Sequence, residues 1–103
     1  MRIIAGNLKG HSLFEPKSKN TRPLKDLTRE SIFNLIMHSS KISLHFEKSN
    51  ILDLYSGIGS FGLECLSRDA RCVYFVENDK SAFEILEKNI EKVKIKNKTK
   101  IFF

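Results

Sequence analysis

Three glycines, Gly57, Gly59 and Gly62, follow a short apolar run in the spacing G-x-G-x-x-G. Glycine has no Cβ atom, so this spacing lets the backbone turn sharply and come close to a ligand. The spacing alone is a weak signal. Here residues 51–54 before it have the pattern of a buried strand, and an apolar helical pattern follows it. The stretch therefore predicts a nucleotide-type cofactor site at a strand–turn–helix junction.

Two acidic residues flank this turn and narrow the choice of cofactor. Asp53 lies four positions before Gly57, and Glu77 ends the next apolar run, twenty positions after Gly57. A carboxylate beside the turn would repel the pyrophosphate of a dinucleotide, whereas it complements the ammonium and sulfonium groups of S-adenosylmethionine. Glu77 is suited to accept hydrogen bonds from both ribose hydroxyls.

Each acid also has a purely structural interpretation. Asp53 could cap the helix that follows the turn, and Glu77 could be a solvated acid at a strand end. A dinucleotide-binding oxidoreductase domain is the rival cofactor class.

The elements around these residues alternate between strand and helix from residue 50 onward. Strands are expected at residues 51–54, 71–77 and 99–103, and the second is a nearly continuous apolar run typical of a parallel sheet. Helices are expected at residues 60–67 and 79–94, with Asn78 as the N-cap of the second. Right-handed crossovers would give an α/β fold with the glycine turn at the carboxyl end of the first parallel strand.

The first half of the chain has a different character. Residues 2–5 and 11–14 have the pattern of a small β-hairpin, and residues 15–25 that of a polar loop. Residues 26–38 predict a helix whose apolar face includes Leu27, Phe33 and Leu35. Arg29 is expected on its polar side. Residues 39–49 form a mixed connection.

Basic residues are concentrated near the N-terminus. Residues 1–25 hold six basic residues and one acidic residue, in a chain whose formal net charge is +6. Such an excess favours a phosphate-rich partner such as RNA, although a solvated basic loop would have the same composition. The candidate RNA-binding residues are Arg2, Lys9, Arg22, Lys25 and Arg29.

Length, composition and cysteine spacing restrict the number of domains, the cellular location and the cofactors to be expected. A chain of 103 residues with 41% hydrophobic residues suits one globular domain and not a disordered protein. No long apolar run predicts a signal peptide or a membrane span, so a cytoplasmic protein without a membrane partner is expected. Cys65 and Cys72 lack the spacing of metal ligands, and no metal is expected.

Several segments together resemble one known family. They closely resemble the amino-terminal half of bacterial 16S rRNA (guanine-N2) methyltransferases of the small-subunit methyltransferase D family. The matching segments are Met1-Arg2-Ile3-Ile4-Ala5-Gly6, Thr21-Arg22-Pro23, Asp53-Leu54-Tyr55-Ser56-Gly57-Ile58-Gly59-Ser60-Phe61-Gly62-Leu63-Glu64 and Val76-Glu77-Asn78-Asp79.

The resemblance implies a class I, Rossmann-like methyltransferase fold, S-adenosylmethionine as methyl donor and a guanine of 16S rRNA in the small ribosomal subunit as acceptor. By position, it implies that Glu77 holds the ribose and that Asn78 lines the adenine side. Arg22 and Arg29 would lie near the mouth of the site. The residues implied around the methionine part, together with Tyr55 of the same motif, are Asp53, Tyr55, Gly57, Gly59 and Gly62.

The sequence differs from the family in one feature, which bears on the methyl acceptor and not on the methyl donor. The family carries a D/N-P-P-Y/F motif that grips the guanine amino group, but the only prolines in this sequence are Pro16 and Pro23. The chain would supply strands 3-2-1 of the family sheet 3-2-1-4-5-7-6, and strand 1 would be an open edge able to self-associate. We therefore expect one truncated domain over residues 1–103, made of a basic part (1–25), a helix and connection (26–49) and a cofactor-binding half (50–103).

This truncated chain is expected to be catalytically inactive by itself. The alternative interpretation is a non-catalytic remnant or an RNA-binding module.

Overall fold

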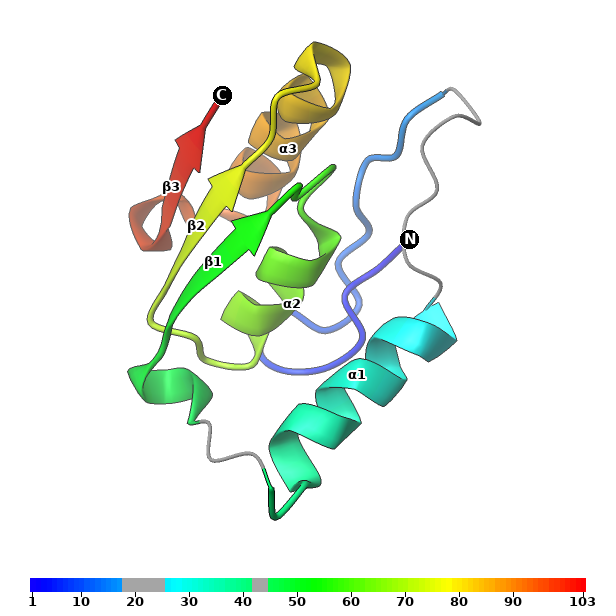
Figure 1. The fold of residues 1–103 in the computed structure, drawn as a ribbon. Coiled ribbons are helices and arrows are strands. Elements are labelled where there is room, and N and C mark those ends of the chain that lie inside the picture. Colours follow the sequence, from blue (N-terminus) through cyan, green and yellow to red (C-terminus); the bar gives the residue numbers. More distant parts are fainter. Residues whose placement is uncertain (18–25, 42–44) are drawn as a thin grey trace.

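The computed structural model describes residues 1–17, 26–41 and 45–103. Helices and strands alternate along the chain, with two short 3₁₀ helices between them (Figure 1). The elements are α1 (Asp26–His38), η1 (Phe46–Lys48), β1 (Asn50–Leu54), α2 (Ser60–Ser67), β2 (Cys72–Val76), α3 (Lys80–Val93), η2 (Lys96–Lys98) and β3 (Thr99–Phe102). The three expected helices and three expected parallel strands are confirmed at nearly the predicted bounds. No helix in the described ranges combines the length and apolar character needed to cross a membrane.

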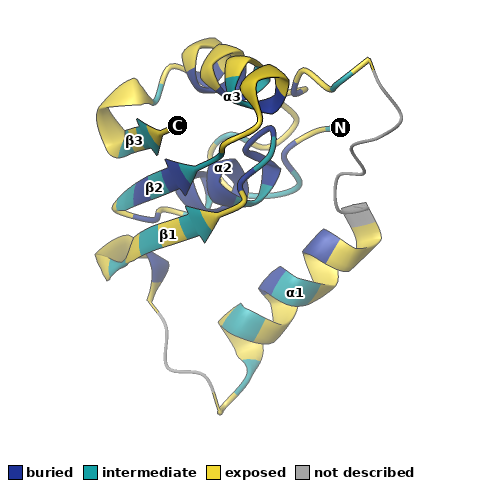
Figure 2. Ribbon diagram, turned by 45° about the horizontal axis from the view of Figure 1, so that its top comes forward, coloured by how far each residue is buried: buried dark blue, intermediate teal, exposed yellow. Residues whose placement is uncertain are grey.

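The three strands form one parallel sheet in the order β1-β2-β3. Its register sets Asp53 of β1 beside Phe75 of β2, and Phe75 beside Ile101 of β3. The helices α2 and α3 each connect two neighbouring strands and lie on the same face of the sheet (Figures 1 and 2). This is the expected 3-2-1 arrangement, in which β1 is an edge strand.

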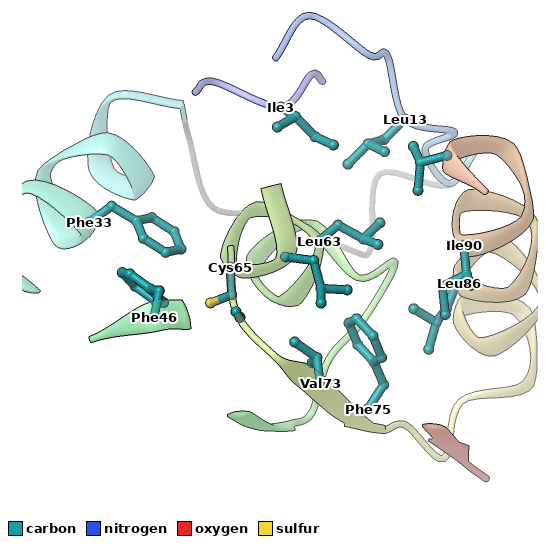
Figure 3. Close-up of a cluster of buried hydrophobic side chains, with 13 residues drawn as sticks. Ile3, Leu13, Phe33, Phe46, Leu63, Cys65, Val73, Phe75, Leu86 and Ile90 are labelled. Carbon is teal, nitrogen blue, oxygen red and sulfur yellow. The ribbon is translucent and has the colours of Figure 1, made fainter. Parts of the chain in front are cut away.

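The face of the sheet toward α2 and α3 holds much of the hydrophobic core. Val73 and Phe75 of β2 are fully buried there and belong to one cluster with Leu63 of α2 and Leu86 of α3 (Figure 3). Fully burying a side chain of this size contributes about 1.5–3 kcal/mol. The core therefore fixes both helices against the strand that precedes Glu77.

The opposite face of the sheet is apolar and largely uncovered by the described residues. Leu52 and Leu54 of β1 are 61% and 57% exposed, and Phe102 of β3 is 50% exposed. In the described part of the chain β1 pairs with β2 alone, so its outer edge presents unpaired backbone groups. Self-association through this edge stays a prediction.

Residues 1–14 form a hairpin-like segment with less strand than expected. A single antiparallel bridge joins Arg2 to Ser12, in place of two strands at residues 2–5 and 11–14. Ile3 still donates its backbone N–H to the carbonyl of His11 at 3.0 Å, whereas the backbone N–H groups of Ile4 and Ala5 donate to the side chain of Glu64 in α2, at 2.9 and 3.1 Å. The segment therefore packs on α2 and does not extend as a ribbon.

The packed face of α1 also differs from the expected one. Arg29 and Phe33 are buried, whereas Leu27 and Leu35 are 76% and 61% exposed. The prediction that Arg29 lies on the polar side of the helix is wrong. Its guanidinium donates a hydrogen bond to the backbone carbonyl of Arg2, so this arginine ties α1 to the N-terminal segment.

Aromatic and cationic contacts complete the packing of α1 on α2. The ring of Phe33 stacks on Phe61 of α2, with ring centroids 4.8 Å apart, and its centroid lies 5.9 Å from that of Phe46 in η1. The guanidinium carbon of Arg68 lies 4.5 Å from the centre of the Phe33 ring. Stacking and cation–π contacts of this kind each contribute about 0.5–1.5 kcal/mol.

Candidate cofactor site

A tight turn joins the carboxyl end of β1 to α2. Ser56 donates its backbone N–H to the carbonyl of Val76 at 3.0 Å, so the turn stays tied to the end of β2. Tyr55, Gly57 and Gly59 have positive φ values of 55°, 58° and 93°. A positive φ is uncommon for a residue such as tyrosine, and strained positions of this kind gather at binding sites. The side chain of Tyr55 is 90% exposed beside the turn.

Glycine suits each of the three positions for a different structural reason. A Cβ atom on Gly57 would meet nothing within 4 Å, so this part of the turn is open. A Cβ atom on Gly59 would lie 2.5 Å from Cδ1 of Leu86 in α3, and one on Gly62 would lie 2.3 Å from Cε1 of Phe75 in β2. The first glycine thus leaves room in front of the turn, while the other two allow close packing behind it.

Asp53 lies at the end of β1 and faces α2. Its Oδ2 atom accepts a hydrogen bond from the backbone N–H of Gly62, in the first turn of α2, at 3.1 Å. Burial raises the pKa of this carboxyl to about 6, the bond from Gly62 lowers it, and the charge of Glu77 raises it further. Burial and the neighbouring Glu77 both disfavour the ionised form of Asp53. A bound cation next to this carboxylate would stabilise that form.

Glu77 follows β2 directly and reaches across to the turn. Its Oε1 atom accepts the backbone N–H of Gly57 at 2.8 Å, and its Oε2 atom accepts that of Asp79 at 2.9 Å. Its own backbone N–H donates to the carbonyl of Phe102 in β3 at 3.1 Å. Glu77 is therefore a fixed part of the turn and not a freely solvated strand-end acid.

The structure brings most of the predicted cofactor-binding residues together at the carboxyl ends of β1 and β2. These residues are Asp53, Tyr55, Gly57, Gly59, Gly62 and Glu77. The capping interpretation of Asp53 is confirmed, because its carboxylate accepts a backbone N–H in the first turn of α2. The role of Asp53 toward a cofactor stays a prediction. A carboxylate offers about four acceptor positions. Each acid can therefore hold the turn and still accept hydrogen bonds from a ligand.

The start of α3 corrects one prediction. The N-cap of this helix is Asp79, not Asn78, since the Asp79 carboxylate accepts the backbone N–H of Ala82 at 2.9 Å. Its hydrogen bonds with Ala82 and then Ser81 lower the pKa of Asp79. Asn78 stays exposed next to Glu77, and its role toward a cofactor stays a prediction.

The predicted RNA-binding residues are only partly brought together. Arg2 and Lys9 line one hollow of about 310 Å³, which Glu30 of α1 also lines. Arg22 and Lys25 lie outside the described residues. Arg29 is fully buried, so the prediction that it faces RNA is corrected: its guanidinium points to the N-terminal segment.

Two buried polar residues that sequence reasoning missed hold the N-terminal segment in place. They are Glu64 of α2 and Asn89 of α3, both with no exposed surface. Asn89 interrupts the otherwise apolar buried stripe of α3, and this interruption is the signal that could have revealed it. Glu64 lies at helical spacing from the buried Ser60 and Ser67 of α2, so the sequence carries no such signal for it. In the described parts of the chain, no group of three or more His, Cys, Asp or Glu side chains is arranged to hold a metal ion.

Comparison with known proteins gives a consistent result. The model of the family described as conserved hypothetical protein 95 matches residues 1–103. Ribosomal RNA small subunit methyltransferase D of Haemophilus influenzae is 38% identical over 94 residues, which cover 91% of this chain and 46% of that protein. The protein of the same name from Escherichia coli K12 is 34% identical over 97 residues, covering 94% and 46%. The solved structure of yhhF, a candidate methyltransferase of Escherichia coli, has a TM-score of 0.79 at 31% identity and covers 98% of this chain and 50% of that one.

These relatives confirm the predicted fold, a partial class I methyltransferase fold of the α/β type with its strands in the order 3-2-1. The chain spans about half the length of the relatives it matches. It belongs to the family described as conserved hypothetical protein 95, a methyltransferase family, and it aligns with the amino-terminal half of its small-subunit rRNA methyltransferase D relatives.

Proposed function

We propose that this chain binds S-adenosylmethionine at its glycine turn and is the donor-binding half of an enzyme that methylates the N2 atom of a guanine in 16S rRNA. The observation that carries this proposal is the pair of carboxylates around the turn. Asp53 is bonded to Gly62 behind the turn, and Glu77 is bonded to Gly57 in front of it.

The chemistry of this pair fits a cationic nucleoside better than a dinucleotide. The backbone N–H of Gly57, which a pyrophosphate would seek, is already bonded to the carboxylate of Glu77. An incoming phosphate would have to displace that carboxylate and lie near a second one, at Asp53. S-adenosylmethionine instead brings positive charge and ribose hydroxyls, and it supplies an activated methyl group. Asp53 would hold the methionine part and Glu77 the ribose.

The acceptor part of the proposal rests on similarity and on charge. The relatives named as rRNA methyltransferases match more than nine tenths of this chain, and six of the basic residues lie in residues 1–25. The guanine N2 atom is implied by the family resemblance. Residues 1–103 do not contain the acceptor-gripping motif, so methyl transfer is proposed for a protein that also has the second half of its relatives.

Isothermal titration calorimetry with the 103-residue chain tests the cofactor part. We expect saturable binding of S-adenosylmethionine and no binding of NAD at the same concentrations. A preference for NAD would contradict the proposal. A chain completed with the second half of a relative should methylate naked 16S rRNA or assembled small subunits, and failure on both substrates would contradict the acceptor assignment.

The basic hollow gives a separate prediction about RNA. Replacing Arg2 and Lys9 together with alanine should weaken binding of a small-subunit rRNA fragment and reduce the slope of log affinity against log salt by about 1.5–2. The reason is that each cation that neutralises a phosphate releases close to one counterion. Fluorescence anisotropy over a range of salt concentrations measures both quantities.

The matched control for this experiment is Lys98→Ala, which removes an exposed cation of η2, outside the hollow. It should leave the slope nearly unchanged. A slope reduction of about 0.7–0.9 for Lys98→Ala, the value expected for one lost phosphate contact, together with no reduction for the double variant, would show that RNA contacts the chain elsewhere and would contradict the assignment of the hollow.

A further inference from the structure

The amide side chain of Asn89 joins three parts of the fold. Asn89 lies in α3 and is fully buried. Its Oδ1 atom accepts the backbone N–H of Phe14 at 2.7 Å, and its Nδ2 atom donates to the carbonyl of Phe14 at 3.2 Å. The same Nδ2 donates to the carbonyl of Ile58, inside the glycine turn, at 2.9 Å. One planar group thus bonds the N-terminal segment and the cofactor turn at once.

Packing alone does not account for an asparagine at this position. Leu86, Ile90 and Val93 form the buried stripe of α3, and a leucine would continue it. Burying an amide without partners costs several kcal/mol, so a buried asparagine is retained where its bonds are all made. Here the bonds leave α3 and end on two segments that are distant in sequence.

The glycine turn rests on α3 at two neighbouring points. Leu86 lies where a Cβ atom of Gly59 would be, and Asn89 holds the carbonyl of Ile58 three residues further along the helix. On its other side, Asn89 holds Phe14, which leads directly into the basic residues 15–25. The middle of the N-terminal segment, residues 4–8, is held by Glu64 and Ser67 of α2 through hydrogen bonds that do not involve residues 57–59.

We propose that Asn89 is a positioning residue that couples the cofactor turn to the N-terminal segment, so that cofactor binding and the ordering of Phe14 strengthen each other. This inference rests on the proposed function, because it requires the turn to bind S-adenosylmethionine. The amide is rigid, so a shift of the Ile58 carbonyl moves both atoms that hold Phe14. Thermodynamic linkage makes this coupling reciprocal. The free energy by which bound cofactor stabilises the ordered state of Phe14 equals the free energy by which ordered Phe14 strengthens cofactor binding.

The test compares Asn89→Ala with Ser67→Ala. Ser67 also holds the N-terminal segment, by accepting the N–H of Leu8 at 3.0 Å and donating to the carbonyl of Ala5. None of its hydrogen bonds reaches residues 57–59, so Ser67→Ala is a matched control that loosens the same segment. Calorimetry gives the S-adenosylmethionine affinity of each variant, and amide hydrogen exchange of Phe14 is measured with and without S-adenosylhomocysteine.

In the wild-type chain the ligand should slow exchange of the Phe14 amide. Asn89→Ala should weaken cofactor affinity about tenfold and remove this ligand effect, whereas Ser67→Ala should keep both. Equal losses in the two variants, or a wild-type Phe14 amide that does not respond to bound ligand, would overturn the inference. The wild-type exchange measurement decides the matter even if Asn89→Ala does not fold. A wild-type chain that binds no cofactor would instead overturn the proposed function.

Discussion

Asp53→Asn is expected to stabilise the folded chain at neutral pH. The folded-state pKa of Asp53, about 6, lies above its ordinary value of 3.8, so the folded chain holds this proton more tightly than the unfolded chain does. The wild type therefore loses stability as the pH rises from about 4 to about 6. Asparagine cannot ionise, yet its Oδ1 can still accept the N–H of Gly62. The gain should grow from near zero at about pH 4 to on the order of 2 kcal/mol above about pH 6, as measured by urea unfolding.

The same substitution should weaken S-adenosylmethionine binding by about 10- to 100-fold, because a hydrogen bond to a charged group contributes about 1.5–3 kcal/mol. Wild-type affinity should fall as the pH drops below about 6, where Asp53 becomes protonated. Calorimetry from pH 5 to pH 8 should show this fall in the wild type and a flat profile in the variant. Glu84→Gln, an exposed site on α3, should change neither property. A variant less stable than the wild type at pH 7 would contradict the assignment.

Glu64→Ala is expected to cost about 3–5 kcal/mol of unfolding free energy. The fully buried carboxylate accepts the N–H groups of Ile4 and Ala5 and the Nε of Arg68, the last at 3.0 Å. Truncation leaves the guanidinium of Arg68, whose side chain is only 7% exposed, and two backbone donors without the carboxylate that accepts from them. For a domain of this size such a loss takes up a large share of the total stability. Urea unfolding monitored by circular dichroism measures it, with the exposed Glu91→Ala as the control.

A double substitution separates the role of the backbone donors from that of the ion pair. Replacing both members of a simple buried ion pair by apolar residues is often neutral. Glu64→Leu combined with Arg68→Leu should remain destabilised here, because the N–H groups of Ile4 and Ala5 would still lack an acceptor. Full recovery of stability in the double variant would show that the ion pair, and not the capture of the N-terminal backbone, is the main contribution of Glu64.

The cofactor half of the fold could be predicted because local pattern and tertiary structure agree there. The buried stripe of α3 indicates the face of that helix that is in fact buried, and the apolar run of β2 indicates a strand inside the parallel sheet, where β2 does lie between β1 and β3. The glycine spacing is demanded by the packing of α2 on the next strand, where Gly62 meets Phe75, and by the packing of the turn on α3, where Gly59 meets Leu86. Asp53 and Glu77 come together because the carboxyl ends of neighbouring parallel strands meet at one edge of the sheet.

The N-terminal half could not be predicted to the same degree, because side chains far along the sequence decide its structure. Glu64 holds the backbone that follows the bridge at Arg2, and Asn89 holds the end of the segment at Phe14. The burial of Arg29 escapes sequence reasoning because a charged side chain is normally assigned to solvent, whereas the carbonyl of Arg2 helps to compensate its burial. The hydrophobic periodicity of a helix does not reveal that a backbone carbonyl from another segment lies opposite one of its faces.

The attachment of residues 1–14 to α2 and α3 has a consequence for synthesis of the chain. Their side-chain partners lie 59 to 80 positions further along the sequence. At about 5–20 residues per second, this segment waits roughly 4–16 s before Glu64, Asn89 and Lys92 are all made. Such long-range closure slows folding, and during that interval Ile3 and Leu13 have no core to enter. Residues 1–14 are therefore among the last parts to fold, and Ile3 and Leu13 stay accessible to chaperones and to aggregation while translation proceeds.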